Sequence, residues 1–267
     1  MQGSNSSDNP LGTYPFGQPL QPVVQTDRTP KKVFVLGVYA SAVHARWVSA
    51  EGKTLVTALA VASEPYIFWR GDGAEDILRK IKVPKAAGHL EPAASNLNGP
   101  SGVTLDEEIL APLGLSRADA WLCDLVPHTC LNDSQKEALD REYEPRRDKL
   151  RLPKVNLPPV PKKFADHTRR AEVLAELEES MAKVVIVLGD EPIRHWLTHY
   201  DGRWKKLSHF AEYGRLHTMG IAGRTYQVLP LAHPRQVGKL GAHSEKWFEA
   251  HQEWKGEAGM LLRRTGL

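Results

Sequence analysis

Three short apolar runs constrain the fold of this chain more than any other feature of its sequence. They read VFVLGV from residue 33, WLCDLV from residue 121 and VVIVLG from residue 184. Runs that are apolar at nearly every position are typical of strands buried on both faces of a parallel sheet. Helical patterns separate the runs, for example AEVLAELEESM before the third. The alternation predicts an α/β domain of three layers, α/β/α, with a mostly parallel central sheet.

Two further apolar runs add strands to this pattern, KTLVTALAVA from residue 53 and a run that ends at Ala232. In open parallel sheets, ligands bind outside the carboxyl ends of the strands. That rule selects four stretches, which should meet at one edge of the sheet. They are GVYASAVHARW from residue 37, DLVPHTCLN from residue 124, GDEPIRHW from residue 189 and AHPRQVGKLG from residue 232.

The composition along the chain predicts one domain between two tails. Residues 1–30 are rich in Ser, Asn, Gln, Pro and Gly and have no periodicity, so we expect a flexible tail. Residues 31–260 should form a single α/β domain, and residues 261–267 a C-terminal tail. With 267 residues, of which 41% are hydrophobic, the chain is long enough to bury a core of this kind.

The cellular setting is also constrained by composition. No apolar stretch approaches the roughly 18 residues of a membrane span, and the first residues, MQGSNSSDNPLG, lack the regions of a signal peptide. Two cysteines are too few for a disulfide framework, which fits a reducing compartment. We expect a cytoplasmic monomer that has no membrane partner.

Positive charge is concentrated between Arg146 and Arg170. This stretch contains nine lysines and arginines against two aspartates. A phosphate backbone is a suitable partner for such a stretch, and on this interpretation Lys162 and Lys163 contact DNA. A solvated surface linker explains the charge equally well.

The stretch directly after the last apolar run contains the residues that point most specifically to a chemical function. His233 follows the run directly, Pro234 restricts the backbone after it, and Arg235 and Lys239 add positive charge. A histidine held in this way can donate a hydrogen bond to the charge that develops on a leaving group. A turn histidine that binds only the backbone is the alternative, and this stretch alone does not separate the two.

The order of the motifs resembles that of the uracil-DNA glycosylase superfamily. The motifs are a strand ending at a glycine, GPSGVTLD from residue 99, WLCDLVPHTCLN from residue 121, VVIVLGDEPIRHW from residue 184 and LPLAHPRQVGKLG from residue 229. They span roughly residues 31–250, and bacterial branches with a GxxG segment before a helix are the most similar. The resemblance implies a DNA glycosylase, which flips a deaminated or modified base out of DNA and hydrolyses its N-glycosidic bond in base excision.

The resemblance also implies roles for individual residues. His233 matches the histidine that stabilises the departing base, and Asp124 stands where the family usually has an asparagine that binds the base edge. Gly37 matches the first glycine of the water-binding motif, and Leu97 lies near the position of a stacking aromatic residue in some branches. Two sets complete the site, a base-binding loop of Val38, Tyr39 and Ser41 and a DNA-binding loop of Pro234, Arg235, Gln236 and Lys239.

The first motif departs from the family. Val38 and Tyr39 stand where the family generally has a carboxylate or an asparagine. His44, Ser41 or Asp124 can take over water activation, and strong stabilisation of the leaving group also permits cleavage with weak activation. An ionised aspartate offers two acceptors, which favours a base edge with an amino group over the carbonyl of uracil.

The resemblance implies no cofactor and no metal. Its iron-sulfur branches use four cysteines, whereas this chain has two, so we expect an atypical branch without a cluster. Cys123, His128 and Cys130 could form part of a metal site, but a fourth ligand is unassigned. Buried core cysteines are the better interpretation.

Two other functions stay open. A protein of the same fold without turnover would bind nucleic acid or a nucleotide, and the missing acid after Gly37 favours it. A hydrolase of free nucleosides would leave the basic stretch as a surface linker. This last function predicts little DNA binding, whereas contacts with several phosphates make affinity fall steeply with salt.

Overall fold

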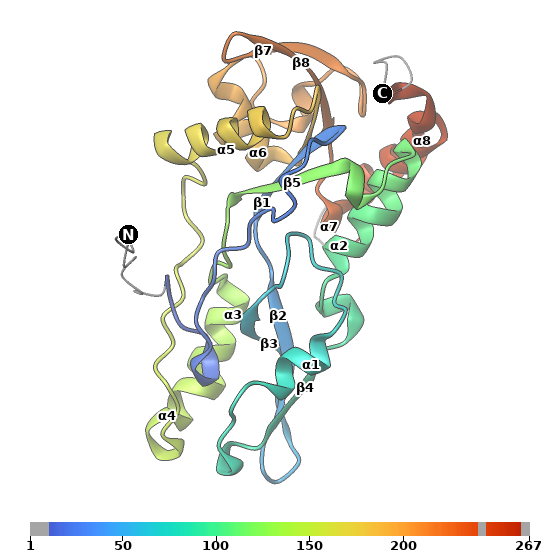
Figure 1. Cartoon of the computed structure of the whole chain (residues 1–267). Helices are drawn as coiled ribbons and strands as arrows, with labels where there is room; N and C mark the ends of the chain where they lie inside the picture. The colour runs from blue at the N-terminus through green and yellow to red at the C-terminus, as the bar shows by residue number, and fades with distance from the viewer. Residues whose placement is uncertain (1–10, 240–243, 263–267) are drawn as a thin grey trace.

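The computed structural model describes residues 11–239 and 244–262, which form two sheets with helices around them (Figure 1). The strands are β1 (Val33–Tyr39), β2 (Ala42–Val48), β3 (Thr54–Ser63), β4 (His89–Pro92), β5 (Ala120–Val126), β6 (Val184–Leu188), β7 (His217–Ile221) and β8 (Arg224–Leu231). The α-helices are α1 (Ala74–Arg79), α2 (Pro100–Thr104), α3 (Asp133–Ala138), α4 (Glu144–Leu150), α5 (His167–Glu179), α6 (Asp190–His195), α7 (Pro234–Val237) and α8 (Glu245–Leu261).

The larger sheet has the strand order β5-β1-β6-β8-β7. Its strands run parallel except β7, which pairs antiparallel with β8. β1 lies between β5 and β6, so that Leu36 is opposite Cys123 of β5 and Val187 of β6. The predicted mostly parallel α/β sheet is confirmed, and β1, β5 and β6 are the three apolar runs, rich in the β-branched residues that favour strands.

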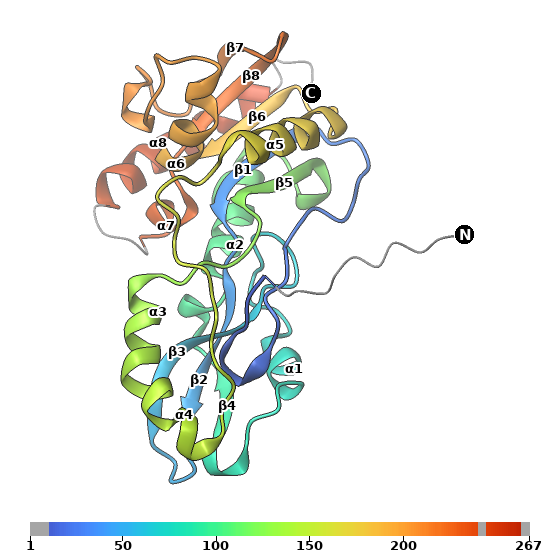
Figure 2. The same cartoon turned by 90° about the vertical axis from the view of Figure 1, so that its left-hand side faces the viewer.

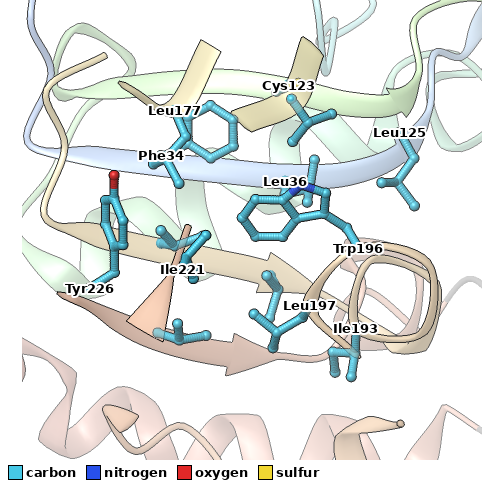
Figure 3. Close-up of a cluster of buried hydrophobic side chains, with 14 of the residues drawn as sticks. Phe34, Leu36, Cys123, Leu125, Leu177, Ile193, Trp196, Leu197, Ile221 and Tyr226 are labelled. Carbon is cyan, nitrogen blue, oxygen red and sulfur yellow. The ribbon is translucent and has the colours of Figure 1, made fainter. Parts of the chain in front are cut away.

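Helices cover both faces of this sheet. α5 and α6 lie on one face, where Phe34, Leu177 and Trp196 form part of a buried core (Figure 3). The other face is covered by α8 and by the helical segment over residues 100–113, which begins with α2. Ile109 and Ala258 are fully buried there. Together they make the expected three layers. None of the helices in the described ranges has both the length and the apolarity needed to cross a bilayer.

The chain passes almost directly from β1 into a second sheet. β2 begins at Ala42 and pairs antiparallel with β3 on one side and β4 on the other. α1, α3 and α4 lie beside this sheet, in the lower half of Figure 2, and its core contains the buried side chains of Trp47, Leu59 and Tyr143. The stretch GVYASAVHARW is therefore largely strand, and the expectation of a loop after β1 is wrong.

The N-terminal segment corrects the expectation of a flexible tail over residues 1–30. Its apolar side chains are spaced between prolines, and Tyr14 and Leu20 are almost completely buried beside Ala42 of β2. Further along, the side-chain oxygen of Gln25 accepts a hydrogen bond from the N–H of Leu122 on the edge strand β5, at 3.2 Å. The segment thus covers an edge that would otherwise be open to pairing with other chains. Residues 1–10 lie outside the described residues.

Residues 261 and 262, expected in a C-terminal tail, belong to the fold instead. Leu261 ends α8, and both Leu261 and Leu262 are buried in the core beneath that helix. Their burial continues the apolar face of α8, which explains why the fold extends past residue 260. Residues 263–267 lie outside the described residues.

Candidate active site

Four strand ends meet at one edge of the larger sheet. Tyr39 at the end of β1 lies opposite Val126 of β5, and Leu188 at the end of β6 lies opposite Leu231 of β8. The segments that follow these residues therefore leave the sheet at the same edge, where α/β proteins bind ligands. Three of the four expected stretches, those after β5, β6 and β8, start there, and the fourth continues into β2.

His233 leaves β8 at this edge and begins α7. Its Nδ1 accepts a hydrogen bond from the backbone N–H of Arg235 at 3.2 Å, so the ring proton is on Nε2. Burial, together with the charge of Arg235, lowers the pKa of His233 to about 4. The imidazole is consequently neutral near pH 7 and still has one N–H to donate. Gly189 permits this position, because a Cβ there would come within 3.2 Å of the His233 Cβ.

Asp124 of β5 lies beside Gly37 of β1 in the parallel register. A Cβ at position 37 would come within 2.2 Å of Asp124 Oδ1 and 2.7 Å of the Phe68 ring. The glycine is thus needed so that a carboxyl and an aromatic ring can meet over the sheet. Asp124 is only 3% exposed. Burial raises its pKa to about 7, with Arg169 opposing and Glu176 reinforcing the shift.

A second buried carboxyl, Glu64, was missed by the sequence reasoning. It follows β3 directly and is 4% exposed. Burial and then the negative charge of Asp124 raise the pKa of Glu64 to about 8, while backbone N–H groups, including that of Ser41, oppose the shift. The charge of Asp124 thus reaches Glu64, and each of the two carboxyls is buried. The available signal was an isolated acid at the end of the apolar run LAVAS, followed by Pro65.

His44 lies on β2 rather than in a loop, and Asn98 fixes its backbone. The Asn98 side chain accepts from the His44 N–H at 3.0 Å and donates to the His44 carbonyl at 3.1 Å. Burial lowers the pKa of His44 to about 4, with the backbone of Ala42 opposing and the charge of Arg235 assisting. Within the described part of the chain, His44 Nδ1 is buried without a hydrogen-bond partner. The charge of Arg235 thus contributes to the lowered pKa of both His44 and His233.

Tyr39 joins this edge to the basic segment before α5. Its ring stacks on Phe164, with centroids 6.3 Å apart and planes 10° from parallel. Burial raises the pKa of Tyr39, and the charge of Arg235 lowers it. Lys162 and Lys163 precede Phe164 and are exposed. The structure therefore brings these two predicted DNA-binding residues next to the predicted base-binding loop.

A pocket of about 360 Å³ lies beside the stack. Pro127 and His128, which follow β5, form one wall, and Lys163 and Phe164 form part of the other. Its entrance is lined by both apolar and cationic groups. It extends the candidate site along the end of β5.

The predicted net charge of the basic stretch is reduced by ion pairs. Arg146 pairs with Glu142 at 2.9 Å and Arg147 with Glu144 at 2.5 Å. Arg169 binds Glu172 at 2.9 Å and also donates to the carbonyl of Asp124 at 2.7 Å, which anchors the end of β5. These arginines are structural, so the stretch is less basic than its composition indicates.

The remaining predicted residues are dispersed around the edge. Val38 is half-buried on β1, Ser41 is exposed between β1 and β2, and Leu97 is 42% exposed in a turn before α2. In α7, Pro234 is buried, Gln236 is half-buried and Arg235 is exposed. Lys239 has a different contact from the one expected, because its ammonium lies 3.9 Å from the centroid of the Phe248 ring.

The cysteines that were considered as metal ligands are both buried. Cys123 lies inside β5 and is 1% exposed, and Cys130 is 3% exposed in the segment after it. Burial raises the pKa of the Cys130 thiol to about 11, so the thiolate that a metal needs is disfavoured there.

The site thus combines a neutral histidine with its ring proton on Nε2, two buried carboxyls with raised pKa values, and cations at its rim. Such a set can stabilise an anionic leaving group, accept a proton from water and hold a polyanion. A scan against protein-family models finds no match to this sequence, and a search of the curated proteins finds no relative.

Proposed function

We propose that this protein is a DNA glycosylase-like hydrolase, which takes a deaminated or otherwise modified base out of DNA and cleaves its N-glycosidic bond. The observation that carries the proposal is His233, whose Nδ1 accepts from the backbone while Nε2 keeps its proton at the edge where the strands end. The order of the motifs, which resembles the uracil-DNA glycosylase superfamily, supports the same reaction.

His233 supplies stabilisation of the leaving base. When the bond between the sugar C1′ and the base nitrogen breaks, negative charge develops on the base, and the Nε2–H donates to it. A neutral donor suffices for this task, and its low pKa of about 4 keeps it neutral across the physiological range. A fixed donor in a partly dry site gains strength from the low local dielectric constant.

Glu64 supplies the water-activating group that the sequence near Gly37 lacks. In its ionised form it accepts a proton from water, whose oxygen then bonds to C1′ as the base departs with the bonding electrons. A pKa of about 8 makes the carboxylate a stronger base than an exposed glutamate. In this proposal Glu64 takes the place of the acid that is missing after Gly37, whose absence favours a binding protein of the same fold without turnover.

In this proposal Asp124 binds the base edge, and its protonation decides which edge it prefers. With a pKa of about 7, a large share of the carboxyl is protonated near neutrality and presents one donor and one acceptor. Deaminated bases carry a carbonyl beside a ring N–H, which is the complementary pattern. The expectation that Asp124 favours an amino group applies only to its ionised form.

DNA contacts come from the rim of the site. Arg235 is exposed beside His233, and Lys162 and Lys163 are exposed beside Tyr39. Extruding a base costs a few kcal/mol, and the cost is lowest for a mispaired or damaged base. Cations that hold the phosphates on either side of the extruded nucleotide would offset part of this cost.

The test is a cleavage assay on labelled oligonucleotides that contain uracil, hypoxanthine, xanthine or a substituted cytosine, with alkali to reveal abasic sites. His233→Ala should slow cleavage by about 10²- to 10³-fold, and Glu64→Gln by about 10²- to 10⁴-fold, with DNA binding retained. His209→Ala, which changes an exposed histidine, is the matched control and should cleave normally. Full activity of the His233 variant, or no abasic product from any base, contradicts the proposal.

A further inference from the structure

A chain of hydrogen bonds runs from Ala232, the residue before His233, through His251 of α8 to Glu108. The backbone N–H of Ala232 donates to the hydroxyl of Tyr213 at 3.1 Å. That hydroxyl lies 2.6 Å from Nδ1 of His251 on α8, and Nε2 of the same ring lies 2.8 Å from the carbonyl of Glu108. His251, at the centre of this chain, is completely buried.

The direction of every proton in this chain is determined. The Glu108 carbonyl can only accept, so His251 Nε2 carries the proton and its Nδ1 is the acceptor. The Tyr213 hydroxyl must then donate to His251, which leaves its lone pair for the Ala232 N–H. Burial lowers the pKa of His251 and raises that of Tyr213, so both groups keep the neutral forms that this order needs.

The Ala232 amide needs such a partner because the sheet ends beside it. The last pair between β6 and β8 is Leu188 with Leu231, and β7 pairs with β8 only as far as Val228. Ala232 is fully buried, and a buried amide without a partner costs about 1–3 kcal/mol. The Tyr213 hydroxyl therefore accepts the hydrogen bond that a neighbouring strand would otherwise accept from this amide.

The loop that carries Tyr213 is itself fixed to α8. The indole N–H of Trp254 donates to the Gly214 carbonyl at 3.1 Å. Gly214 has a φ of +66°, and a Cβ there would come within 2.2 Å of the Trp254 ring. Lys255 holds Glu108 from the same helix, at 2.6 Å. Two successive residues of α8 thus hold the loop of Tyr213 and the side chain of Glu108.

We infer that Tyr213 and His251 are positioning residues for His233, which they hold in place through the Ala232 amide. The inference rests on the proposed function, because it assigns His233 as the donor to the leaving base. A displacement of about 1 Å at a catalytic group can lower a rate by about 10²-fold. Gly189 also packs closely against His233, since a Cβ at position 189 would lie 3.2 Å from the His233 Cβ.

The first experiment is a double-mutant cycle in single-turnover cleavage. Tyr213→Phe keeps the ring beside Trp247 and removes only the hydroxyl, and it should lower the cleavage rate by about tenfold or more with DNA affinity changed less than about twofold. In a His233→Ala background the same substitution should have almost no effect. An equal loss in both backgrounds, or no loss in the first, overturns the inference.

Two further variants separate positioning from general damage. His251→Gln can still accept at one atom and donate at another, and it should retain more activity than His251→Leu, which does neither. Tyr226→Phe is the matched control. It removes a hydroxyl near the start of β8, whereas His233 follows the end of that strand. Equal activities of the two His251 variants contradict the inference.

Nuclear magnetic resonance tests the chain without reference to catalysis. With isotope-labelled histidine, Tyr213→Phe should shift the ring signals of His233, whereas Tyr226→Phe should not. If the wild-type protein cleaves no base while the His233 signals respond as expected, the proposed function fails and the positioning device stands. Unchanged His233 signals in Tyr213→Phe refute the device itself.

Discussion

Asp124 illustrates at the scale of one residue how burial changes recognition. The same side chain offers two acceptors when ionised, and a donor with an acceptor when protonated. Its pKa of about 7 puts the change within the physiological range. Because the raised pKa means that the protonated form is present below about pH 7 and is lost above it, the preferred base edge should depend on pH in the same way.

The prediction concerns inhibition by free uracil. In the wild type, the inhibition constant should rise by about tenfold from about pH 6 to pH 8, as Asp124 loses the proton that it donates to the base carbonyl. Asp124→Asn keeps a donor and an acceptor at every pH, so its inhibition constant should stay flat. A pH-independent constant in the wild type would show that Asp124 does not bind this edge.

The site was only partly predictable from single residues. His233, Asp124 and Tyr39 lie at the sheet edge where the strand-end rule placed them, because a parallel sheet brings these ends together whatever the loops do. Glu64 was not predictable from the motif at Gly37, because it lies 27 residues further along the chain. The chain forms β2 and β3 before Glu64 comes within range of the charge of Asp124, and no local sequence pattern predicts this long-range proximity.

At the scale of elements, the strands of the larger sheet were predictable and β2 was not. Uniform runs such as VVIVL have only one suitable environment, a sheet covered on both faces. In β2, alanines and an exposed Arg46 dilute the apolar pattern, and long-range packing around Trp47 decides the structure instead. The N-terminal segment is similar, since each of its buried side chains is set between prolines without a period.

The packing of that segment gives a stability prediction. Leu20→Ala should reduce the free energy of unfolding by about 2–4 kcal/mol, because Leu20 is 1% exposed and its removal leaves a cavity beside β2. Leu11→Ala is the matched control and should change it by less than about 0.5 kcal/mol, since Leu11 is 54% exposed. Urea unfolding followed by circular dichroism provides both values. Equal, small effects would mean that the segment does not contribute to the fold.

At the scale of the whole molecule, the position of a cation relative to the two ends of the parallel strands matters more than its position in the sequence. The basic stretch from Arg146 to Arg170 loses much of its charge to ion pairs, and the exposed Lys162 and Lys163 lie beside the Tyr39 stack. Two other cations, Lys183 and Arg224, lie at the starts of β6 and β8 and therefore at the opposite edge of the sheet. Net charge is the same for either pair, so position alone distinguishes them.

This arrangement predicts how DNA affinity depends on salt. If DNA lies across the carboxyl edge, replacing Lys162 and Lys163 by glutamine removes about two phosphate contacts, and the slope of log affinity against log salt should become shallower by about two. The same change at Lys183 and Arg224 should leave the slope unaltered, because long-range attraction at the far edge is screened within about 10 Å at moderate salt. Fluorescence anisotropy over a salt series measures both slopes. The two double variants carry equal net charge. Equal slopes would therefore mean that the DNA binds elsewhere or that overall charge alone determines its binding. A change in slope confined to the Lys162 and Lys163 variant would locate the DNA at the edge that holds His233.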